Sequence, residues 1–436
     1  MINAGDGTMR YYSTRDKECR TWALADAAFM GLAPDGGLFV PERIPQADME
    51  RVERLAERSY ADMATYVAGL IMDDLDADML SEAVREAYDF PIRLYGLGDG
   101  RFTLELFHGP TFAFKDFGAR FMGRVAGLLN GGRELVVLAA TSGDTGSAVA
   151  HGFCGVEGVR VVILYPAGKV SPLQEAQMTT IGGNIYPLRV DGTFDDCQRL
   201  VKEMFGDRAL RRRVRITSAN SINLLRWLPQ SFYYFYGWSM WHRTTGRTAP
   251  EIVVPSGNCG NLAAGMLARR MGLPVKGFVA ASNANDVVPE FLRTGVYRPR
   301  PSVRTVANAM DVGAPSNFER MLWLYGGDAE AMRRDLRGYS CDDDDILALI
   351  AEQKTRFGYL SDPHSAVGFG AAEALGVDGF WLSTAHAAKF GGAIRRAAGV
   401  EPSLPPALAE ALSLPGHAVD MAAEAGALRE YLVAMV

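Results

Sequence analysis

The sequence has 436 residues, a formal net charge of −6, 48% hydrophobic residues and 22% charged residues. These values are typical of a globular protein and exclude a disordered or fibrous chain. A chain of this length is expected to form about two or three domains with a substantial core. The mild acidity gives no electrostatic reason to expect a nucleic-acid partner.

The five cysteines are widely scattered, with no C-x-x-C pair and no zinc-like spacing. This pattern predicts reduced thiols in the cytoplasm and no metal site. The N-terminus lacks a basic stretch followed by an apolar run, and no segment approaches the roughly 18 apolar residues that cross a bilayer. We therefore expect a cytoplasmic protein that is not embedded in a membrane. The acidic run 342–345 precedes the apolar ILALI, which favours a helix start over a cation site.

In chain order, the first elements are helical stretches at residues 46–58 and 60–72, which we assign to an N-terminal cap domain of residues 1–95. A strand, a glycine-rich turn and a helix follow from Glu134, with further candidate strands at residues 159–165 and 181–190. The same alternation resumes at Glu251. It predicts an α/β fold with buried parallel strands. Residues 401–436 are expected to form a helical C-terminal tail.

Lys115 lies in a segment rich in phenylalanine: Phe107, Phe112, Phe114 and Phe117. A desolvated ammonium loses stabilisation of its charge, so its pKa falls and the free amine becomes a nucleophile towards aldehydes. The same residues also fit a lysine whose aliphatic stem covers apolar surface while its charge pairs with Asp116. Lys115 taken alone leaves both interpretations open.

Two loops, each between a predicted strand and a predicted helix, are suited to anions. In residues 257–261, free backbone N–H groups and the helix dipole converge, and glycines allow close approach. This loop matches neither G-x-x-x-x-G-K-[ST] nor G-x-G-x-x-G, and a ligand-free turn is the alternative. Residues 141–146 carry hydroxyls that suit a carboxylate, while Asp144 can accept a hydrogen bond; an ordinary helix cap is the alternative.

Six motifs in this order resemble the threonine synthase family of pyridoxal phosphate enzymes: HGPTFAFKD, TSGDTGSAVA, LYPAGKVSPLQE, SANSINLLR, PSGNCGN and STAHAAKF. The YYSTR and APDGGLFVP stretches are similar to the amino-terminal domain of that family. The resemblance runs from about Arg10 to about Gly392. It implies a fold type II enzyme with two parallel-sheet α/β domains and an N-terminal cap. The larger domain would comprise residues 96–128 with 214–400, and the smaller one residues 129–213.

The resemblance also implies roles in binding pyridoxal 5′-phosphate. Lys115 would bond covalently to the cofactor and act as the catalytic base. Thr384 would meet the pyridine nitrogen, and Asp144 would meet the ring 3′-hydroxyl, although the family varies between Asn and Asp there. The cofactor phosphate would be held by Gly257, Asn258, Cys259, Gly260 and Asn261. Cys259 stands where the family often has an aromatic residue.

The family converts O-phospho-L-homoserine and water into L-threonine and phosphate by γ-elimination and β-addition of water. This reaction needs two further anion sites. For the substrate carboxylate we expect Ser142, Gly143 and Thr145. For the substrate phosphate we expect Lys169, Asn220, Ser221, Asn223 and Arg226. A surface ion pair is the alternative for Arg226, and His108 and His386 fit either a proton relay or oriented core histidines.

Two other functions compete with this interpretation. A related fold type II lyase, such as a serine/threonine dehydratase or a phospholyase, would use the same lysine and glycine loop. A catalytically silent homologue would only bind ligands or partners. The sequence leaves the subunit arrangement open; the resemblance implies a monomer, with a dimer as the alternative.

Overall fold

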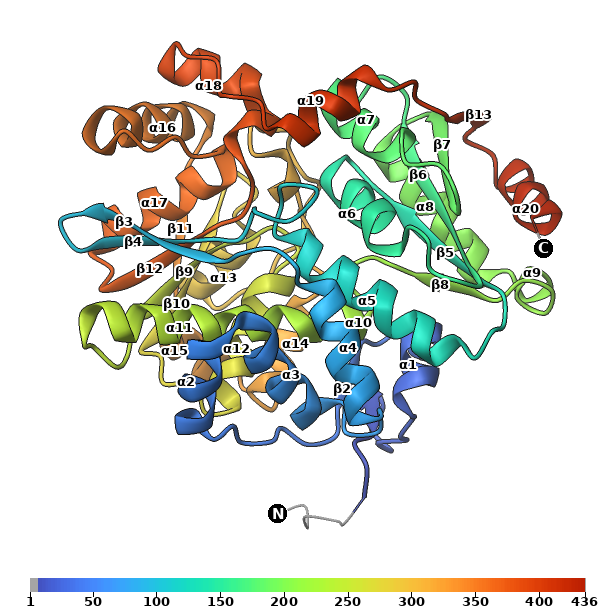
Figure 1. Ribbon diagram of the computed structural model, residues 1–436, viewed down its shortest axis with the longest axis horizontal. Coiled ribbons are helices and arrows are strands. Elements are labelled where there is room, and N and C mark those ends of the chain that lie inside the picture. The colour runs from blue at the N-terminus through green and yellow to red at the C-terminus, as the bar shows by residue number, and fades with distance from the viewer. Residues whose placement is uncertain (1–6, 436) are drawn as a thin grey trace.

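A computed structural model describes residues 7–435 (Figure 1). The chain forms a two-stranded, a six-stranded and a five-stranded sheet. The two larger sheets carry the body of the molecule, and the blue N-terminal helices pack beneath the six-stranded one (Figure 1). The expected architecture, two parallel-sheet α/β units with an N-terminal cap, is confirmed.

The N-terminal cap contains an antiparallel pair of short strands and four helices. Asp48, Ser59 and Asp76 accept hydrogen bonds from backbone N–H groups at the starts of α2, α3 and α4, which explains where those helices begin. The elements are β1 (Tyr11–Ser13), α1 (Leu24–Met30), β2 (Phe39–Pro41), α2 (Met49–Arg58), α3 (Tyr60–Ile71) and α4 (Ala77–Ala87).

The six-stranded sheet has the order β11-β10-β9-β12-β4-β3, and its pairs are parallel except β3 with β4. Its strands are β3 (Arg93–Gly98), β4 (Arg101–Glu105), β9 (Glu251–Pro255), β10 (Gly277–Ser282), β11 (Leu336–Ser340) and β12 (Gly379–Ser383). The chain around it forms α5 (Lys115–Asn130), α10 (Leu224–Trp227), η1 (Leu228–Ser231), α11 (Phe232–Thr245), α12 (Gly260–Arg270), α13 (Val287–Thr294), η2 (Asn308–Met310), α14 (Phe318–Leu324), α15 (Ala329–Asp335), α16 (Asp343–Phe357), α17 (Pro363–Leu375), η3 (Ala387–Phe390) and α18 (Gly391–Ala398). Strands β9, β10 and β12 are buried throughout, as expected for parallel strands covered on both faces.

The five-stranded sheet is entirely parallel, in the order β13-β7-β6-β5-β8. Its strands are β5 (Leu135–Ala140), β6 (Val159–Pro166), β7 (Ile185–Asp191), β8 (Ile216–Ser218) and β13 (Val419–Ala422). Its helices are α6 (Asp144–Phe153), α7 (Pro172–Thr179), α8 (Phe194–Gly206), α9 (Arg208–Arg211), α19 (Pro406–Ser413) and α20 (Ala425–Ala434).

Two details of this sheet differ from the expected elements. Strand β7 starts at Ile185 rather than at residue 181, because Gly182 and Gly183 adopt left-handed φ values of 71° and 63°. The C-terminal segment holds two helices, as expected, but also the short exposed strand β13, which pairs with β7. The domain boundaries stay a prediction.

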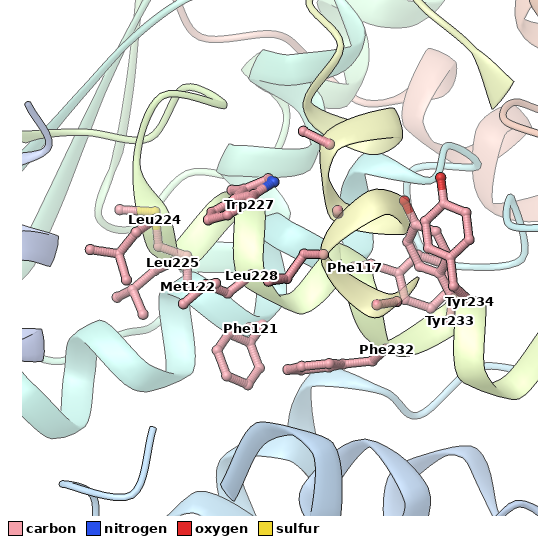
Figure 2. Packing of buried hydrophobic residues seen from close by; sticks show 14 of the residues in the cluster. Phe117, Phe121, Met122, Leu224, Leu225, Trp227, Leu228, Phe232, Tyr233 and Tyr234 are labelled. Atoms are coloured by element: carbon pink, nitrogen blue, oxygen red, sulfur yellow. The ribbon is translucent and has the colours of Figure 1, made fainter. Parts of the chain in front are cut away.

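An aromatic cluster beneath α5 fixes the position of that helix. Figure 2 shows Phe117 and Phe121 facing the start of α11. The ring of Phe117 lies 5.1 Å from that of Tyr233, and the ring of Phe121 lies 5.7 Å from that of Phe232, both edge to face. The aromatic start of α11 therefore packs in the core against α5. It anchors the helix that begins at Lys115.

Two other expectations concern helix starts and membranes. Asp342 caps α16 and forms a capping box with Asp345, so the acidic run starts a helix as predicted. No helix within residues 7–435 has the length and apolarity needed to cross a membrane.

Candidate active site

Lys115 is the first residue of α5, and the loop before it is tied to the segment that carries Thr384. The backbone N–H of Phe114 donates to the Thr384 carbonyl at 2.8 Å, and the N–H of His386 donates to the Phe112 carbonyl at 3.0 Å. In this loop Phe112 adopts a positive φ of 55°, which is unfavourable for a residue with a bulky side chain. Lys115 and Thr384 are thereby held next to each other, although they are far apart in sequence.

The amine of Lys115 has no hydrogen bond or ion pair with any described residue. Burial lowers its pKa to about 8; the Asp144 carboxylate opposes this shift, and the charges of Lys389 and Arg226 reinforce it. At this pKa roughly a tenth of the amine is unprotonated at pH 7 and about half at pH 8. The unprotonated form is the state in which a lysine acts as a nucleophile or a base.

Asp116 does not neutralise Lys115. Its carboxyl group is buried and accepts hydrogen bonds from the Thr111 N–H at 2.9 Å and the Thr111 hydroxyl at 2.7 Å. Burial raises the pKa of Asp116 to about 6. A Cβ on Gly109 would lie 2.5 Å from an Asp116 oxygen, so glycine is required where the turn passes over this carboxyl group. Asp116 stabilises the loop, and the alternative interpretation of Lys115 as one half of a local ion pair is not supported.

The loop 256–261 connects β9 to α12 and presents free donors. The backbone N–H groups of residues 257–262 donate no hydrogen bond to any described residue. A Cβ on Gly257 would lie 2.7 Å from the Met310 Cα, so the loop passes directly against η2. The Asn261 side chain accepts hydrogen bonds from the Tyr233 and Tyr234 hydroxyls at 2.6 and 2.7 Å. The result is a fixed set of N–H groups at a helix N-terminus, which is suited to an anion.

Cys259 belongs to the same loop and takes a left-handed φ of 57°. Its side chain is 3% exposed, and burial raises the pKa of its thiol to about 12. The thiol is therefore protonated and contributes no charge to the loop.

The loop 141–146 connects β5 to α6 and is organised by its own threonine. The Thr141 hydroxyl accepts hydrogen bonds from the N–H groups of Gly143 and Gly146 at 2.9 and 2.8 Å. The N–H groups of Ser142 and Thr145 donate to no described residue. This loop, too, can hold an anion, as the sequence predicts.

Unlike the other loop, this one contains an acid that is already paired. The Asp144 carboxylate lies 2.8 Å from the Lys389 ammonium and 3.0 Å from the Gln174 amide nitrogen. Burial alone would raise the pKa of Asp144, but the ammonium groups of Lys389 and Lys115 hold it well below its usual value. Asp144 is therefore a carboxylate at every pH of interest.

The segment 219–226 contacts the glycine loop 256–261 through a side-chain hydrogen bond. The Asn258 amide donates to the Ser221 hydroxyl at 2.7 Å. Arg226 is 4% exposed and donates to the Ala219 carbonyl, yet it has no carboxylate partner in the described chain, and its Nε is buried without a hydrogen bond. Burial lowers its pKa to about 10. Arg226 is thus a buried cation rather than a surface ion pair.

The other predicted phosphate ligands occupy different settings. The Asn223 amide nitrogen donates to the Ala28 and Ser218 carbonyls at 2.8 and 3.0 Å, and its oxygen caps α10. The Asn220 side-chain oxygen is buried without a hydrogen bond. Lys169 lies exposed in the turn after β6, and within the described chain its amine contacts none of the groups above. The role of Lys169 stays a prediction.

The two histidines have structural contacts. His108 Nε2 lies 2.8 Å from a Glu105 oxygen, and Tyr359 donates to the other Glu105 oxygen at 3.0 Å. His386 caps η3 by accepting a hydrogen bond from the Ala388 N–H at 3.2 Å. Burial lowers the pKa of His386, so its ring is neutral. These contacts agree with oriented histidines at the edge of the site.

Three side chains at the site were not predicted from the sequence: Gln174, Arg320 and Lys389. Arg320 is fully buried and donates to the Ser221 and Ile222 carbonyls at 3.1 and 2.8 Å. It therefore holds the segment 219–226 in place. The capping-box pattern at Ser171 marks Gln174 only as a helix residue, and no local signal marks Arg320.

The fold and these groups define a class of protein. Residues 101–380 match the family model described as "Pyridoxal-phosphate dependent enzyme". Residues 10–88 match "Threonine synthase N terminus", and residues 365–432 match "Threonine synthase, C-terminal". The chain is thus a pyridoxal phosphate enzyme of the expected fold type.

Individual relatives give the particular family. A threonine synthase of Serratia marcescens is 40% identical over 98% of this chain and 100% of its own length. The structure of a pyridoxal phosphate-bound threonine synthase from Brucella melitensis has a TM-score of 0.91 at 34% identity, covering 98% of this chain and 99% of that one. The Escherichia coli threonine synthase structure has a TM-score of 0.90 at 39% identity, covering 98% and 100%. The chain belongs to the threonine synthase family.

Proposed function

We propose that this protein converts O-phospho-L-homoserine and water into L-threonine and inorganic phosphate. The observation that carries the proposal is Arg226, a buried arginine near Lys115 that has no carboxylate partner within residues 7–435. A dehydratase has no substrate phosphate to bind and gains nothing from such a cation. A phosphate dianion instead wants charge-assisted donors.

The groups at the site fit pyridoxal phosphate. The N–H groups of residues 257–262, which have no acceptor within residues 7–435, suit its phosphate, and the Lys115 amine, whose pKa is lowered to about 8, makes no hydrogen bond or ion pair there. The Thr384 side-chain hydroxyl has no hydrogen bond with a described residue, so it can donate to the pyridine nitrogen. Asp144 would meet the ring 3′-oxygen. When bound, the cofactor withdraws electrons from the substrate, which makes protons at Cα and Cβ easier to remove.

In this proposal Lys115 holds the cofactor and then moves protons. Its amine is freed when the substrate amine takes its place, and it is then the base for the proton at Cα and next for the proton at Cβ. The lowered pKa suits both directions of transfer, because amine and ammonium forms are both populated near pH 8.

The substrate's two anionic ends would bind on opposite sides of Lys115. The Arg226 guanidinium, the Ser221 hydroxyl and the side-chain N–H groups of Asn220 would donate to the γ-phosphate. The Asn223 amide already donates to carbonyl groups of the fold, so its role would be to hold the segment 219–226 in place. The exposed Lys169 would attract the substrate phosphate as it approaches from solvent. The free N–H groups and hydroxyls around Ser142, Gly143 and Thr145 would hold the α-carboxylate. Water then adds at Cβ, beside the departing phosphate.

The test is phosphate release from O-phospho-L-homoserine by the cofactor-loaded protein, with the product amino acid identified. We expect equal amounts of threonine and phosphate, both lost in Lys115→Ala. Phosphate accompanied by a keto acid would indicate a phospholyase instead. A protein that binds the cofactor but releases no phosphate would act on another amino acid.

We also propose that the protein works as a cytoplasmic monomer. Every group assigned above comes from a single chain, so no second copy is needed to complete the site. Cys19 and Cys154 are exposed and unpaired, which suits a reducing compartment. Light scattering of the purified protein at working concentration tests the assembly state, and a dimer would contradict the proposal.

A further inference from the structure

Lys389 and Asp144 form a buried ion pair at the centre of the site. Their side chains are 0% and 4% exposed, and the Lys389 nitrogen lies 2.8 Å from an Asp144 oxygen. The same ammonium donates to the Thr111 carbonyl at 2.8 Å. Gln174 donates to the same Asp144 oxygen at 3.0 Å. Both charged groups are therefore satisfied by fixed partners inside the protein.

The pair joins elements from both halves of the molecule. Lys389 lies in η3, which follows β12 of the six-stranded sheet, whereas Asp144 begins α6 of the five-stranded sheet. Thr111 belongs to the loop that leads to Lys115. The pair thus lies where the two sheets and the Lys115 loop meet.

Stability alone does not account for such a pair. Removing two charges from water is costly, and apolar residues of similar volume are often as stable in the same place. Ala388, next to Lys389, packs in an apolar cluster with Leu173 and Leu408, so this region of the chain accommodates apolar side chains. A buried pair retained beside a reactive amine is better explained by the charge that it sets there.

The ring oxygen of pyridoxal phosphate gives a reason for an ion pair at this place. Under the function proposed above, Asp144 meets that oxygen, which is anionic when the cofactor is joined to an amine. A carboxylate beside an anionic oxygen is repulsive, whereas a neutral amide in its place would donate a hydrogen bond. Asp144 and Lys389 together carry no net charge, as one amide does.

We propose that Lys389 is a positioning residue that neutralises Asp144, so that this carboxylate can lie beside the cofactor's ring oxygen. This inference rests on the proposed function only through the role of Asp144 towards the cofactor. The Lys389–Asp144 pair also explains why Asp144 does not hold the Lys115 amine protonated. Without Lys389, the Asp144 carboxylate would be left to pair with Lys115 and hold it protonated.

Four variants test the inference: Lys389→Met, Asp144→Asn, the double variant, and Lys354→Met as control. Methionine is close to lysine in size and removes the charge together with the hydrogen bond that Lys389 donates to the Thr111 carbonyl. Lys354 is an exposed lysine of α16. Three quantities are measured on each: the dissociation constant of pyridoxal phosphate, the pH midpoint of the cofactor's visible absorbance change, and the melting temperature without cofactor. None of these depends on turnover of a substrate.

Each single variant leaves a buried charge unpaired, so we expect each to weaken cofactor binding about tenfold or more. In Lys389→Met the absorbance midpoint is expected to move to higher pH. The Asp144 carboxylate then lacks its ammonium partner, and its negative charge favours the protonated form of the absorbing cofactor. The double variant restores a neutral pair and is expected to recover binding to within about threefold of the parent. Lys354→Met is expected to match the parent in all three quantities.

Two outcomes would overturn the inference: Lys389→Met binding the cofactor with parental affinity and midpoint, or a double variant as weak as Lys389→Met. If Lys389→Met does not fold, the double variant must still bind more tightly than Asp144→Asn. A role in folding alone would move the melting temperatures and leave the absorbance midpoint unchanged. If the parent binds the cofactor but forms no threonine, the proposed reaction fails while the pairing result stands.

Discussion

Two loops of this molecule share one design, residues 141–146 after β5 and residues 256–261 after β9. Each joins a buried parallel strand to a helix and leaves backbone N–H groups without acceptors. The first carries the acid Asp144, which Lys389 neutralises, whereas the second carries no ionisable group other than a protonated thiol. The same strand–loop–helix arrangement therefore gives one site that contains a carboxylate neutralised within the protein and one that only receives an anion.

The largest effect is expected from filling the backbone space of the second loop. In Gly257→Ala the new Cβ would lie 2.7 Å from the Met310 Cα and 3.0 Å from the Ala309 oxygen, so the loop must move. We expect the dissociation constant of pyridoxal phosphate to rise about a hundredfold, because the displaced N–H groups no longer point at the cofactor phosphate. Absorbance titration measures this. Gly69→Ala in α3, with no atom near the new methyl group, is the control, and equal binding by both variants would contradict the assignment.

The next effect separates the cofactor loop from the adjoining segment 219–226. Arg226→Gln removes the buried cation but keeps a hydrogen-bonding side chain. We expect kcat/KM for O-phospho-L-homoserine to fall about tenfold to a hundredfold, since charge-assisted hydrogen bonds to the phosphate are lost. Cofactor affinity should stay within about threefold of the parent.

Steady-state kinetics and inhibition by inorganic phosphate both report this change. The exposed Arg212, which has no ion pair in the described chain, provides the control Arg212→Gln. If Arg226→Gln weakens the cofactor as much as the substrate, Arg226 serves the cofactor phosphate instead.

The sequence predicts these loops well because each lies within one contiguous strand–loop–helix unit. Lys115 and Thr384 are also marked by local motifs. Arg320 is different, since it contacts Phe39, Ser221 and Ile222, which converge only when the cap and both sheets have assembled. The partnership of Lys389 with Asp144 likewise depends on tertiary packing. Strand β13 was missed for the same reason: four mostly exposed residues form a strand only because β7 offers them an edge.

A smaller effect is expected from changing the charge around the first loop. Gln174→Glu keeps the oxygen that accepts from the Ser171 N–H but replaces the donor to Asp144 with a second carboxylate. Like-charge repulsion should weaken cofactor binding up to about tenfold at pH 8 and less at lower pH. Absorbance titration at both pH values measures it. Gln198→Glu on α8 is the control, and a loss that does not depend on pH would point to a packing defect.

The last effect concerns folding stability rather than binding, and it arises from the charge balance at Lys115, which faces the first loop. Its pKa is about 8 in the folded protein against 10.5 ordinarily, so the unfolded chain binds the proton more readily. Between these pH values the unfolded state carries more protons, and stability gained from this group rises with pH. Below pH 8 the whole penalty remains, at most about 3 kcal/mol from about 1.4 kcal/mol per pKa unit. Lys115→Met has no such penalty.

Cofactor-free Lys115→Met should therefore be more stable than the cofactor-free parent below pH 8, and the difference should shrink as the pH approaches 10.5. Urea unfolding of both proteins across this pH range measures the difference in their free energies of unfolding. Groups that titrate alike in both proteins do not contribute to this difference. A difference that is constant with pH would mean that the methionine gains only by packing. A difference that begins to grow only as the pH rises past 10.5 would mean that Asp144 raises the Lys115 pKa and holds the amine charged, so the first loop would not deliver an unprotonated amine.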